Sequence, residues 1–310
     1  MTDIAAPSLT VVILTHNEER HIARALHAVA GIARAVVVVD SGSTDATVAL
    51  AERGGARVLR HRWTNYADQF RWALDHAGID TDWVMRLDAD EVVEPDLAAA
   101  LADTLPTLGA DVTGVNLLRK HIFMGRFIRY GGRYPLVLLR VWRHGAARIE
   151  QRWMDEHMVV EHGRVITVPG GFADVNKGDL TFFTAKHNGY ATREAIDILS
   201  QRHGLLPPDR ALSARTASRQ ASVKRWVKER VYNRLPLGVG PLGYFLWRYL
   251  FQLGFLDGRA GLIYHFLQGF WYRFLVDAKV HEFERGLAGA RDADERRRRL
   301  SALTGHKLDG

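Results

Sequence analysis

The sequence predicts an α/β protein with a mostly parallel central sheet flanked by helices. Four short apolar runs rich in β-branched residues are typical of buried parallel strands, and they occupy residues 9–14, 35–39, 57–59 and 83–87. Segments with apolar residues at helical spacing separate these runs, so strand and helix alternate through residue 90. At 310 residues the chain can form one large α/β domain with an appendage, or two domains.

The helices follow the strands in regular order. Apolar residues recur at helical spacing from Ile22 to Val29, a second helix starts in the polar turn 40–45 and stops at Gly54-Gly55, and a third is expected over residues 66–76. Beyond Asp90 the pattern loosens. We expect helices at 95–105 and 188–202, strands at 112–118 and 136–142, and a mixed loop and strand region at 148–168.

Charge divides the chain into a near-neutral body and a basic end. We predict a catalytic domain over residues 1–204 and a basic, aromatic-rich helical region over residues 205–310. Residues 201–310 hold 20 Lys and Arg against 10 Asp and Glu, which predicts an anionic partner such as a membrane surface. The absence of cysteine excludes disulfides and thiolate metal sites. The first residues lack the features of a signal peptide, and no run of eighteen apolar residues predicts a spanning helix.

The strand at 83–87 ends in the carboxylates of Asp88, Asp90 and Glu91. Carboxylates at i and i+2 of an extended chain point to the same side, where their charges repel unless a cation lies between them. Hard oxygen ligands suit Mg²⁺ or Mn²⁺, which also bind substrate phosphates. Glu91 is expected to be a helix-start or structural residue.

Two more polar segments, residues 15–19 and 40–45, follow apolar strands. Open α/β sheets bind ligands at the carboxyl ends of their strands, so the three segments together are typical of a nucleotide site completed by metal. Neither a Gly-x-Gly-x-x-Gly pattern nor a Walker pattern occurs, which argues against dinucleotide and P-loop chemistry.

In order and spacing, the motifs at residues 11–19 (Val-Val-Ile-Leu-Thr-His-Asn-Glu-Glu), 38–45 (Val-Val-Asp-Ser-Gly-Ser-Thr-Asp) and 87–91 (Leu-Asp-Ala-Asp-Glu) resemble family 2 glycosyltransferases of the GT-A fold. The resemblance is to bacterial enzymes that build lipopolysaccharide cores and other surface polysaccharides. It covers roughly residues 8–200, with a second match at Gly254-Phe255-Leu256-Asp257-Gly258.

The resemblance implies a role for each matching residue. The nucleotide pocket would be lined by Thr15, Asn17 and Glu18, and Asp40 would bond the base or ribose. A helix facing the donor would carry Gln69 and Arg71, although both could equally lie on a solvated helix face.

The resemblance also implies a metal site and a base. Asp88 would contact the ribose or the metal shell, and Asp90 would hold Mg²⁺ or Mn²⁺ against the diphosphate. Many relatives place a histidine ligand where this chain has Asp174, so Asp174 is the candidate third ligand. The general base that deprotonates the acceptor hydroxyl would be Glu156, with Asp155 as the alternative; a surface acidic cluster is the other interpretation.

Aromatic and basic residues fill the C-terminal region. A basic amphipathic pattern over residues 223–234 and the aromatic stretch 243–276 predict a segment that lies on a membrane, although the aromatic side chains could instead pack as core.

We therefore expect an inverting, metal-dependent enzyme that transfers a sugar from a nucleotide-diphosphate sugar to a lipid-linked or lipopolysaccharide-type saccharide, and we expect the donor to be UDP-linked. It would be cytoplasmic, peripherally associated with the inner face of the cytoplasmic membrane, and would bind no nucleic acid. The alternatives are a sugar-phosphate nucleotidyltransferase, disfavoured because the expected Gly-rich loop is missing, and a non-catalytic membrane- or nucleic-acid-binding protein, disfavoured because no nucleic-acid module is recognisable.

Overall fold

The computed structural model describes residues 8–150, 157–205 and 236–308. The chain divides into two compact units, the first comprising residues 1–151 and 156–177 and the second residues 152–155 and 178–310. Each unit has its own hydrophobic clusters.

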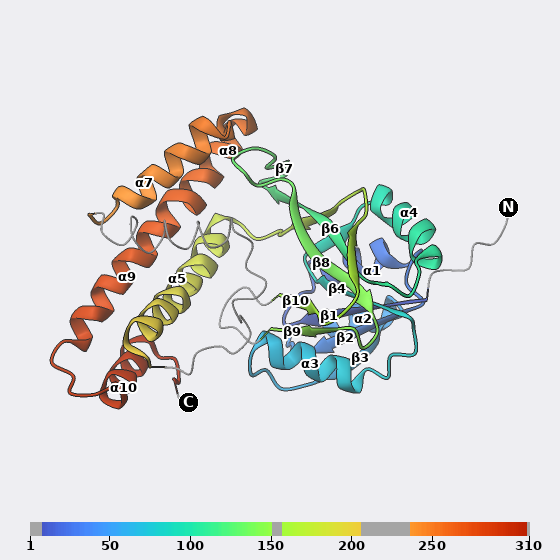
Figure 1. Cartoon of the computed structure of the whole chain (residues 1–310), viewed down its shortest axis with the longest axis horizontal. Coiled ribbons are helices and arrows are strands. Elements are labelled where there is room, and N and C mark those ends of the chain that lie inside the picture. The colour runs from blue at the N-terminus through green and yellow to red at the C-terminus, as the bar shows by residue number, and fades with distance from the viewer. Residues whose placement is uncertain (1–7, 151–156, 206–235, 309–310) are drawn as a thin grey trace. The chain divides into compact units, whose positions relative to one another are not determined.

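The first unit is built on one large mixed sheet (Figure 1). Its path runs β3-β2-β1-β4-β8-β6-β12-β5, with β7 and β11 paired to β6. The four strands β3, β2, β1 and β4 are parallel, as the alternating sequence predicted, and β8 then joins β4 in the antiparallel sense. The strands of the sheet are β1 (Leu9–Thr15), β2 (Ala35–Asp40), β3 (Arg57–Arg60), β4 (Trp83–Asp88), β5 (Glu91–Val93), β6 (Val112–Phe123), β7 (Arg126–Phe127), β8 (Leu136–Arg143), β11 (Arg164–Thr167) and β12 (Phe172–Val175).

Helices cover both faces of the sheet because the residues of each central strand alternate between two apolar clusters. In β1, Leu9, Val11 and Ile13 join the cluster that includes α1 (Ile22–Val29), α2 (Thr47–Arg53) and α4 (Pro95–Thr104). Val12 joins the opposite cluster, against α3 (Tyr66–His76). A separate hairpin of β9 (Ala147–Ile149) and β10 (Met158–Val160) adds apolar side chains to that second cluster.

Two strands that bound the site were not predicted. β5 and β12 pair in the antiparallel sense, with Asp174 opposite Glu91, and β12 also runs parallel to β6. Each has only three or four residues, too few for a periodic signal in the sequence. Their pairing places residues that are 83 positions apart in the chain on adjacent strands.

The second unit contains four principal helices among the described residues, α5 (Leu180–His203), α7 (Val239–Leu246), α9 (Tyr272–Leu287) and α10 (Ala293–Thr304), together with the short α8 (Gly258–Tyr264). Helix α5 starts eight residues earlier than expected, because the Asp179 side chain caps it by accepting a hydrogen bond from the N–H of Phe182. It packs against α9 through one apolar cluster. This packing puts the unit boundary at residues 177–178, whereas the sequence placed it at 204–205.

Within the described part of the chain, no helix is both long enough and apolar enough to cross a membrane. The charged segment after residue 292 forms α10, whose N-terminus is capped by the Asp292 side chain through the N–H of Glu295.

Candidate active site

The ends of β1 and β2 meet at a buried carboxylate. Thr15 and Asp40 are paired in register, and the Thr15 hydroxyl donates to Asp40 Oδ1 at 3.1 Å. The other oxygen, Oδ2, accepts the backbone N–H groups of Gly42 and Ser43, both at 2.9 Å. Burial raises the pKa of Asp40, but the hydrogen bonds from Ser43, Gly42 and Thr15 outweigh burial and hold it below its ordinary value. Asp40 is therefore an ionised carboxylate that orders the 40–45 turn.

Asn17 links the loop after β1 to that turn. Its backbone has a φ of 56°, in the left-handed region that Asn tolerates better than most residues. The Asn17 N–H donates to Ser43 Oγ at 2.8 Å, and its side-chain Oδ1 accepts the N–H of Thr44 at 2.8 Å. The two polar segments predicted from the sequence are thus joined in space, and Asn17 lies at their surface.

Glu18 belongs to a chain of hydrogen bonds that reaches β12. The N–H of Lys177 donates to His21 Nε2 at 3.0 Å, so this nitrogen is the acceptor and Nδ1 carries the proton. Nδ1 lies 2.7 Å from Glu18 Oε2 and donates to it. The Glu18 carboxylate thereby connects the loop after β1 with the segment after β12, although its neighbours were not predicted.

Of the two predicted residues on α3, only Arg71 is exposed. The Gln69 side chain is fully buried, its Oε1 lies 2.8 Å from His61 Nδ1, and its Nε2 donates to the His61 carbonyl at 3.2 Å. Gln69 therefore orders the segment between β3 and α3, a role that the sequence pattern alone did not reveal.

Asp88 ends β4 among cationic and phenolic groups. Tyr66 donates its hydroxyl proton to Asp88 Oδ1 at 2.7 Å, and the guanidinium groups of Arg140 and Arg86 lie 3.4 and 3.5 Å from the carboxylate. Burial raises the pKa of Asp88, but Arg140, Arg86 and Tyr66 outweigh it and hold the pKa well below its ordinary value. Arg86 also stacks on the Tyr66 ring at 4.3 Å. None of these three partners was predicted.

Asp90 lies two residues further on, beyond buried Ala89. Both Asp88 and Asp90 are half-buried, but β4 ends at Asp88 and residues 89–90 form a turn, so the extended geometry expected from the i and i+2 spacing does not hold here. Asn176 Nδ2 donates to Asp90 Oδ2 at 3.0 Å, and the N–H of Val175 donates to the Asp90 carbonyl at 3.0 Å. Burial lowers the pKa of Arg24, and the nearby Asp90 charge opposes this shift.

Glu91 is structural, as expected, but in a strand rather than at a helix start. Its Oε1 accepts from Arg140 at 2.6 Å and its Oε2 accepts the N–H of Asp88 at 2.9 Å. Burial raises the pKa of Glu91, Arg140 opposes the shift, and the Asp88 charge adds to it. Through these bonds Glu91 fixes the position at which β4 ends.

Asp174, the candidate third metal ligand, is held in a buried ion pair. Its Oδ2 accepts from the Arg119 guanidinium and lies 3.0 Å from His121 Nδ1. Burial raises the pKa of Asp174, but His121 and Arg119 outweigh it and hold the pKa well below its ordinary value. Arg119 and His121 stand at i and i+2 of β6, a spacing that places them on one side of a strand and was the available sequence signal.

The side chains at this site, in the described part of the chain, suit a metal ion that is coordinated by few protein ligands. The described residues contain no group of three or more His, Asp or Glu side chains that could hold a metal ion. Mg²⁺ commonly binds through one or two carboxylates, substrate phosphates and water. The hard oxygens of Asp90 match that chemistry, whereas the cations around Asp88 disfavour direct coordination there. Glu156 and Asp155, the predicted bases, lie outside the described residues.

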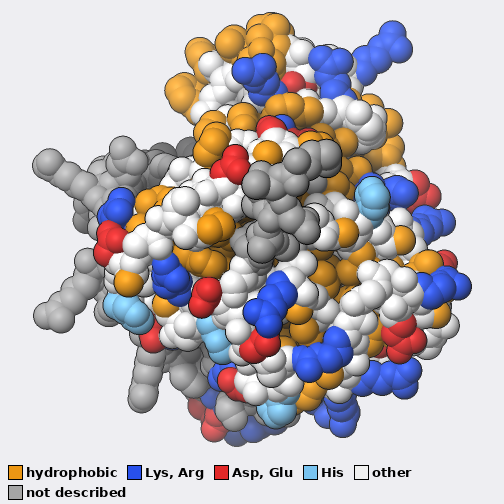
Figure 2. Space-filling view, turned by 90° about the vertical axis from the view of Figure 1, so that its right-hand side faces the viewer, with side chains coloured by type: hydrophobic (Ala, Val, Ile, Leu, Met, Phe, Trp, Pro, Cys, Tyr) orange, Lys and Arg blue, Asp and Glu red, His pale blue; other side chains and the backbone are white. Residues whose placement is uncertain are grey.

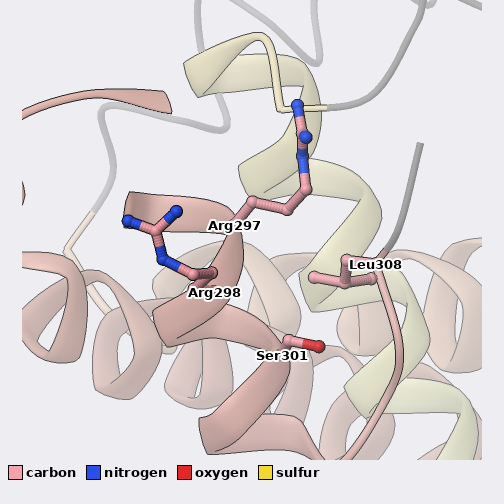
Figure 3. A pocket seen from close by; sticks show the side chains of 4 residues that line it. All are labelled: Arg297, Arg298, Ser301 and Leu308. Atoms are coloured by element: carbon pink, nitrogen blue, oxygen red, sulfur yellow. The ribbon is translucent and has the colours of Figure 1, made fainter. Parts of the chain in front are cut away.

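A small pocket beside α10 has no part in this site. It has a volume of about 170 Å³ and is lined by Arg297, Arg298, Ser301 and Leu308, all from the second unit (Figure 3). No carboxylate lines it, so it lacks the chemistry of the strand ends.

Comparison with known proteins gives matches to glycosyltransferases. An uncharacterised glycosyltransferase of Rickettsia conorii is 42% identical over 89 residues, covering 29% of this chain and 31% of the relative. The lipopolysaccharide core biosynthesis glycosyltransferase LpsC of Rhizobium meliloti is 30% identical over 151 residues, covering 41% of this chain and 53% of the relative. The matches thus span about a third to a half of the length of these relatives.

Among solved structures, glucosyl-3-phosphoglycerate synthase from Mycobacterium tuberculosis in complex with Mn²⁺, UDP and glucosyl-3-phosphoglycerate is 26% identical, with a TM-score of 0.32. The similarity covers 37% of this chain and 45% of that one. Another crystal structure of that synthase contains Mn²⁺ and UDP-glucose.

The family model described as glycosyl transferase family 2 matches residues 10–166, which include the three strand-end segments and most of the mixed sheet. The expected α/β architecture with a C-terminal helical region is confirmed, and so is the expected enzyme class. Because this match covers half of the chain, the protein belongs to glycosyl transferase family 2.

Proposed function

We propose that this glycosyltransferase moves a sugar, with inversion, from a UDP-linked donor to a lipid-linked or lipopolysaccharide-type saccharide. The observation that carries the proposal is the meeting of the ends of β1, β2 and β4, where Thr15 bonds Asp40 and the neighbouring strand ends in Asp88. Ligands of open α/β sheets bind at such carboxyl ends. The similarity to LpsC supports an acceptor of the lipopolysaccharide class.

In this proposal the turn ordered by Asp40 receives the nucleotide. Asp40 bonds the base or ribose, while Thr15, Asn17 and Glu18 line the pocket, in the loop that Asn17 links to the turn. Arg71 is exposed on α3 and would face the donor, whereas buried Gln69 acts through the segment that carries His61.

Asp90 would hold Mg²⁺ or Mn²⁺, and Asp88 would contact the ribose or the water shell of the metal. The bound cation would compensate the charge of the leaving diphosphate. Arg140 and Tyr66 orient the Asp88 carboxylate for its contact. To become a third ligand, Asp174 would exchange its ion pair with Arg119 for the metal.

Glu156 is the proposed general base, with Asp155 as the alternative. Its carboxylate accepts the proton of the acceptor hydroxyl as that oxygen forms a bond to the anomeric carbon. The bond from the anomeric carbon to the phosphate oxygen breaks on the opposite side, and the nucleoside diphosphate leaves. One in-line displacement inverts the anomeric configuration.

A lipid-linked acceptor requires the enzyme to work at a membrane, and we propose that it associates peripherally with the inner face of the cytoplasmic membrane. The basic composition of residues 201–310 supports this placement, because each basic group near an anionic surface contributes about 1 kcal/mol.

A screen of sugar nucleotides with Mn²⁺ or Mg²⁺ tests the catalytic proposal. We expect slow hydrolysis of one UDP-sugar that chelator abolishes, and a loss of about 100-fold or more in Asp90→Asn, because the diphosphate loses its charge compensation. Asp80→Asn is the matched control, since the Asp80 side chain is 71% exposed in a surface ion pair. Formation of UTP and a sugar 1-phosphate on addition of pyrophosphate, instead of UDP release, would identify a nucleotidyltransferase, and full activity of Asp90→Asn would refute the metal role.

A further inference from the structure

The second unit combines two opposite patterns of burial. Where α5, α9 and α10 pack together, the apolar residues are inside, among them Leu199, Val276, Phe283 and Leu300, each at most 6% exposed. This is the arrangement expected of helices in water. The preceding stretch, residues 236–271, which we call the apolar hairpin, is arranged the other way.

The surface of the apolar hairpin is hydrophobic. Between residues 237 and 266, thirteen large apolar side chains are 38–71% exposed. They are Leu237, Val239, Leu242, Tyr244, Leu246, Trp247, Leu250, Phe251, Leu253, Phe255, Leu256, Leu262 and Phe266. Hydrophobic side chains also gather at the top of Figure 2, the height at which α7 and α8 lie in Figure 1. Contiguous apolar surface of this kind marks a contact with another apolar phase or partner.

The interior of the apolar hairpin is polar. Arg248, Asp257 and His265 are 3%, 2% and 0% exposed. Arg248 donates to the Tyr244 hydroxyl at 3.4 Å and to Gln268 Oε1 at 3.3 Å, and His265 Nε2 lies 3.9 Å from Asp257 Oδ2. Charged groups in a hydrocarbon environment turn inward and pair with one another in the same way.

Two glycines allow this polar interior to close. A Cβ at Gly261 would lie 2.4 Å from Asp257 Cβ, and a Cβ at Gly254 would lie 2.7 Å from His265 Cδ2. Small residues that bring backbones close are typical of helix contacts in lipid. Gly254 and Asp257 belong to the Gly-Phe-Leu-Asp-Gly segment that the proposed function did not use.

We propose that the apolar hairpin inserts into one leaflet of a lipid bilayer, with buried Arg248, Asp257 and His265 kept inside the protein. This inference rests on the proposed function, because it specifies how the enzyme reaches a lipid-linked acceptor. Its distinctive claim is insertion of apolar side chains, which goes beyond adsorption of a basic segment to anionic lipid.

Length and charge favour insertion of the apolar hairpin into one leaflet over a span of the whole bilayer or a contact with another protein. Helix α7 continues into a π-helical turn (Trp247–Phe251), and together they extend no more than about 20 Å, short of the roughly 30 Å of a hydrocarbon core. Of the three charged residues in the apolar hairpin only Arg259 is exposed, a cation suited to phosphate headgroups. The exposed positions from Val239 to Phe251 spread over more than half of the helix circumference, which lipid can cover and one flat protein interface cannot.

Labelling can test insertion directly because the chain contains no cysteine. Phe251→Cys places a single thiol at a side chain that is 71% exposed, and Trp63→Cys places one in the first unit, at 47% exposure. Each full-length protein is labelled with a polarity-sensitive dye and mixed with phosphatidylcholine vesicles containing phosphatidylglycerol. We expect a blue shift at residue 251, retained at high salt, and none at residue 63. No shift at either position would overturn the proposal.

Flotation with the same vesicles supplies a second measurement. Trp247→Asp should lower the bound fraction by about tenfold or more, because a carboxylate is expelled from hydrocarbon, whereas Trp63→Asp should bind as the unchanged protein does. Dimerisation in light scattering without vesicle binding would show instead that a second copy covers the surface. UDP-sugar hydrolysis, measured without vesicles, separates the two proposals. Insertion without hydrolysis contradicts only the proposed catalytic function, and hydrolysis without insertion contradicts only the proposed insertion.

Discussion

Asp40 shows how a single carboxylate can order the site and stabilise the fold at once. It accepts four hydrogen bonds, from the Thr15 hydroxyl, the N–H of Gly42, and both the N–H and the hydroxyl of Ser43. Because four groups donate to it, the Asp40 carboxylate is fixed before any ligand binds. The adjacent nucleotide pocket would therefore be preorganised, which lowers the entropy lost on binding.

We expect Asp40→Asn to lower the free energy of unfolding by about 1–3 kcal/mol at pH 7, because charge-assisted hydrogen bonds are lost. The pKa of Asp40 is depressed in the folded state, so its stabilisation is present above its ordinary pKa and is lost as pH falls through the folded pKa. The difference between the two proteins should therefore shrink below about pH 4. Urea unfolding of both proteins across a pH series measures this difference in the free energy of unfolding.

Asp111→Asn is the control for that series. Asp111 forms an exposed ion pair with Arg164 at 3.0 Å, and such pairs contribute about 1 kcal/mol or less. A difference for Asp40→Asn that stayed constant from pH 7 to pH 3 would contradict the role given to its charge.

At the scale of elements, the short strands β5 and β12 complete the site. Their pairing sets Asp174 opposite Glu91, and the end of β12 places Asn176 beside Asp90. The backbone of the turn before β12 packs closely against α4. Gly170 in this turn has a φ of +89°, and a Cβ there would lie 2.6 Å from the Leu97 nitrogen.

We expect Gly170→Ala to destabilise the protein by about 2–4 kcal/mol, combining left-handed strain with a clash against the α4 backbone. Gly145→Ala is the matched control. Gly145 has a similar φ of +78° but nothing within 4 Å of the added Cβ, so only the strain of about 1 kcal/mol should remain. Equal losses in thermal unfolding would show that the contact with Leu97 does not matter.

At the scale of the whole molecule, the chain has two units with separate apolar clusters. Proteins whose domains have separate cores often depart from two-state unfolding. The family match ends at residue 166, so residues 178–310 of the second unit lie beyond it.

We expect calorimetry to resolve two unfolding transitions. Leu101→Ala removes a fully buried side chain from the first unit and Leu199→Ala removes one from the second, each at a cost of about 2–5 kcal/mol. Because the clusters are separate, each variant should lower the midpoint of a different transition. A single transition that both variants lower equally would show that the units unfold together.

The sequence by itself determined the alternating elements and the carboxyl-end chemistry. The helix at residues 66–76 was predicted to the residue, and the four residues that recur at helical spacing in the first helix, Ile22, Ala25, Leu26 and Val29, are buried. The strand ends at Asp40 and Asp88 were also predicted to within one residue. These features are local, because the period of the apolar residues and the polar residues that interrupt it are both visible in a short window.

Only the tertiary structure decided which groups surround those carboxylates. Arg140, Arg119 and Tyr66 come from β8, β6 and α3, and no local period connects them with Asp88 or Asp174. The register of non-adjacent strands fixes such pairs, and a register shift of one residue would turn each side chain to the opposite face. Likewise, the inward Arg248 of the apolar hairpin looks in the sequence like one more basic residue; only its burial distinguishes it.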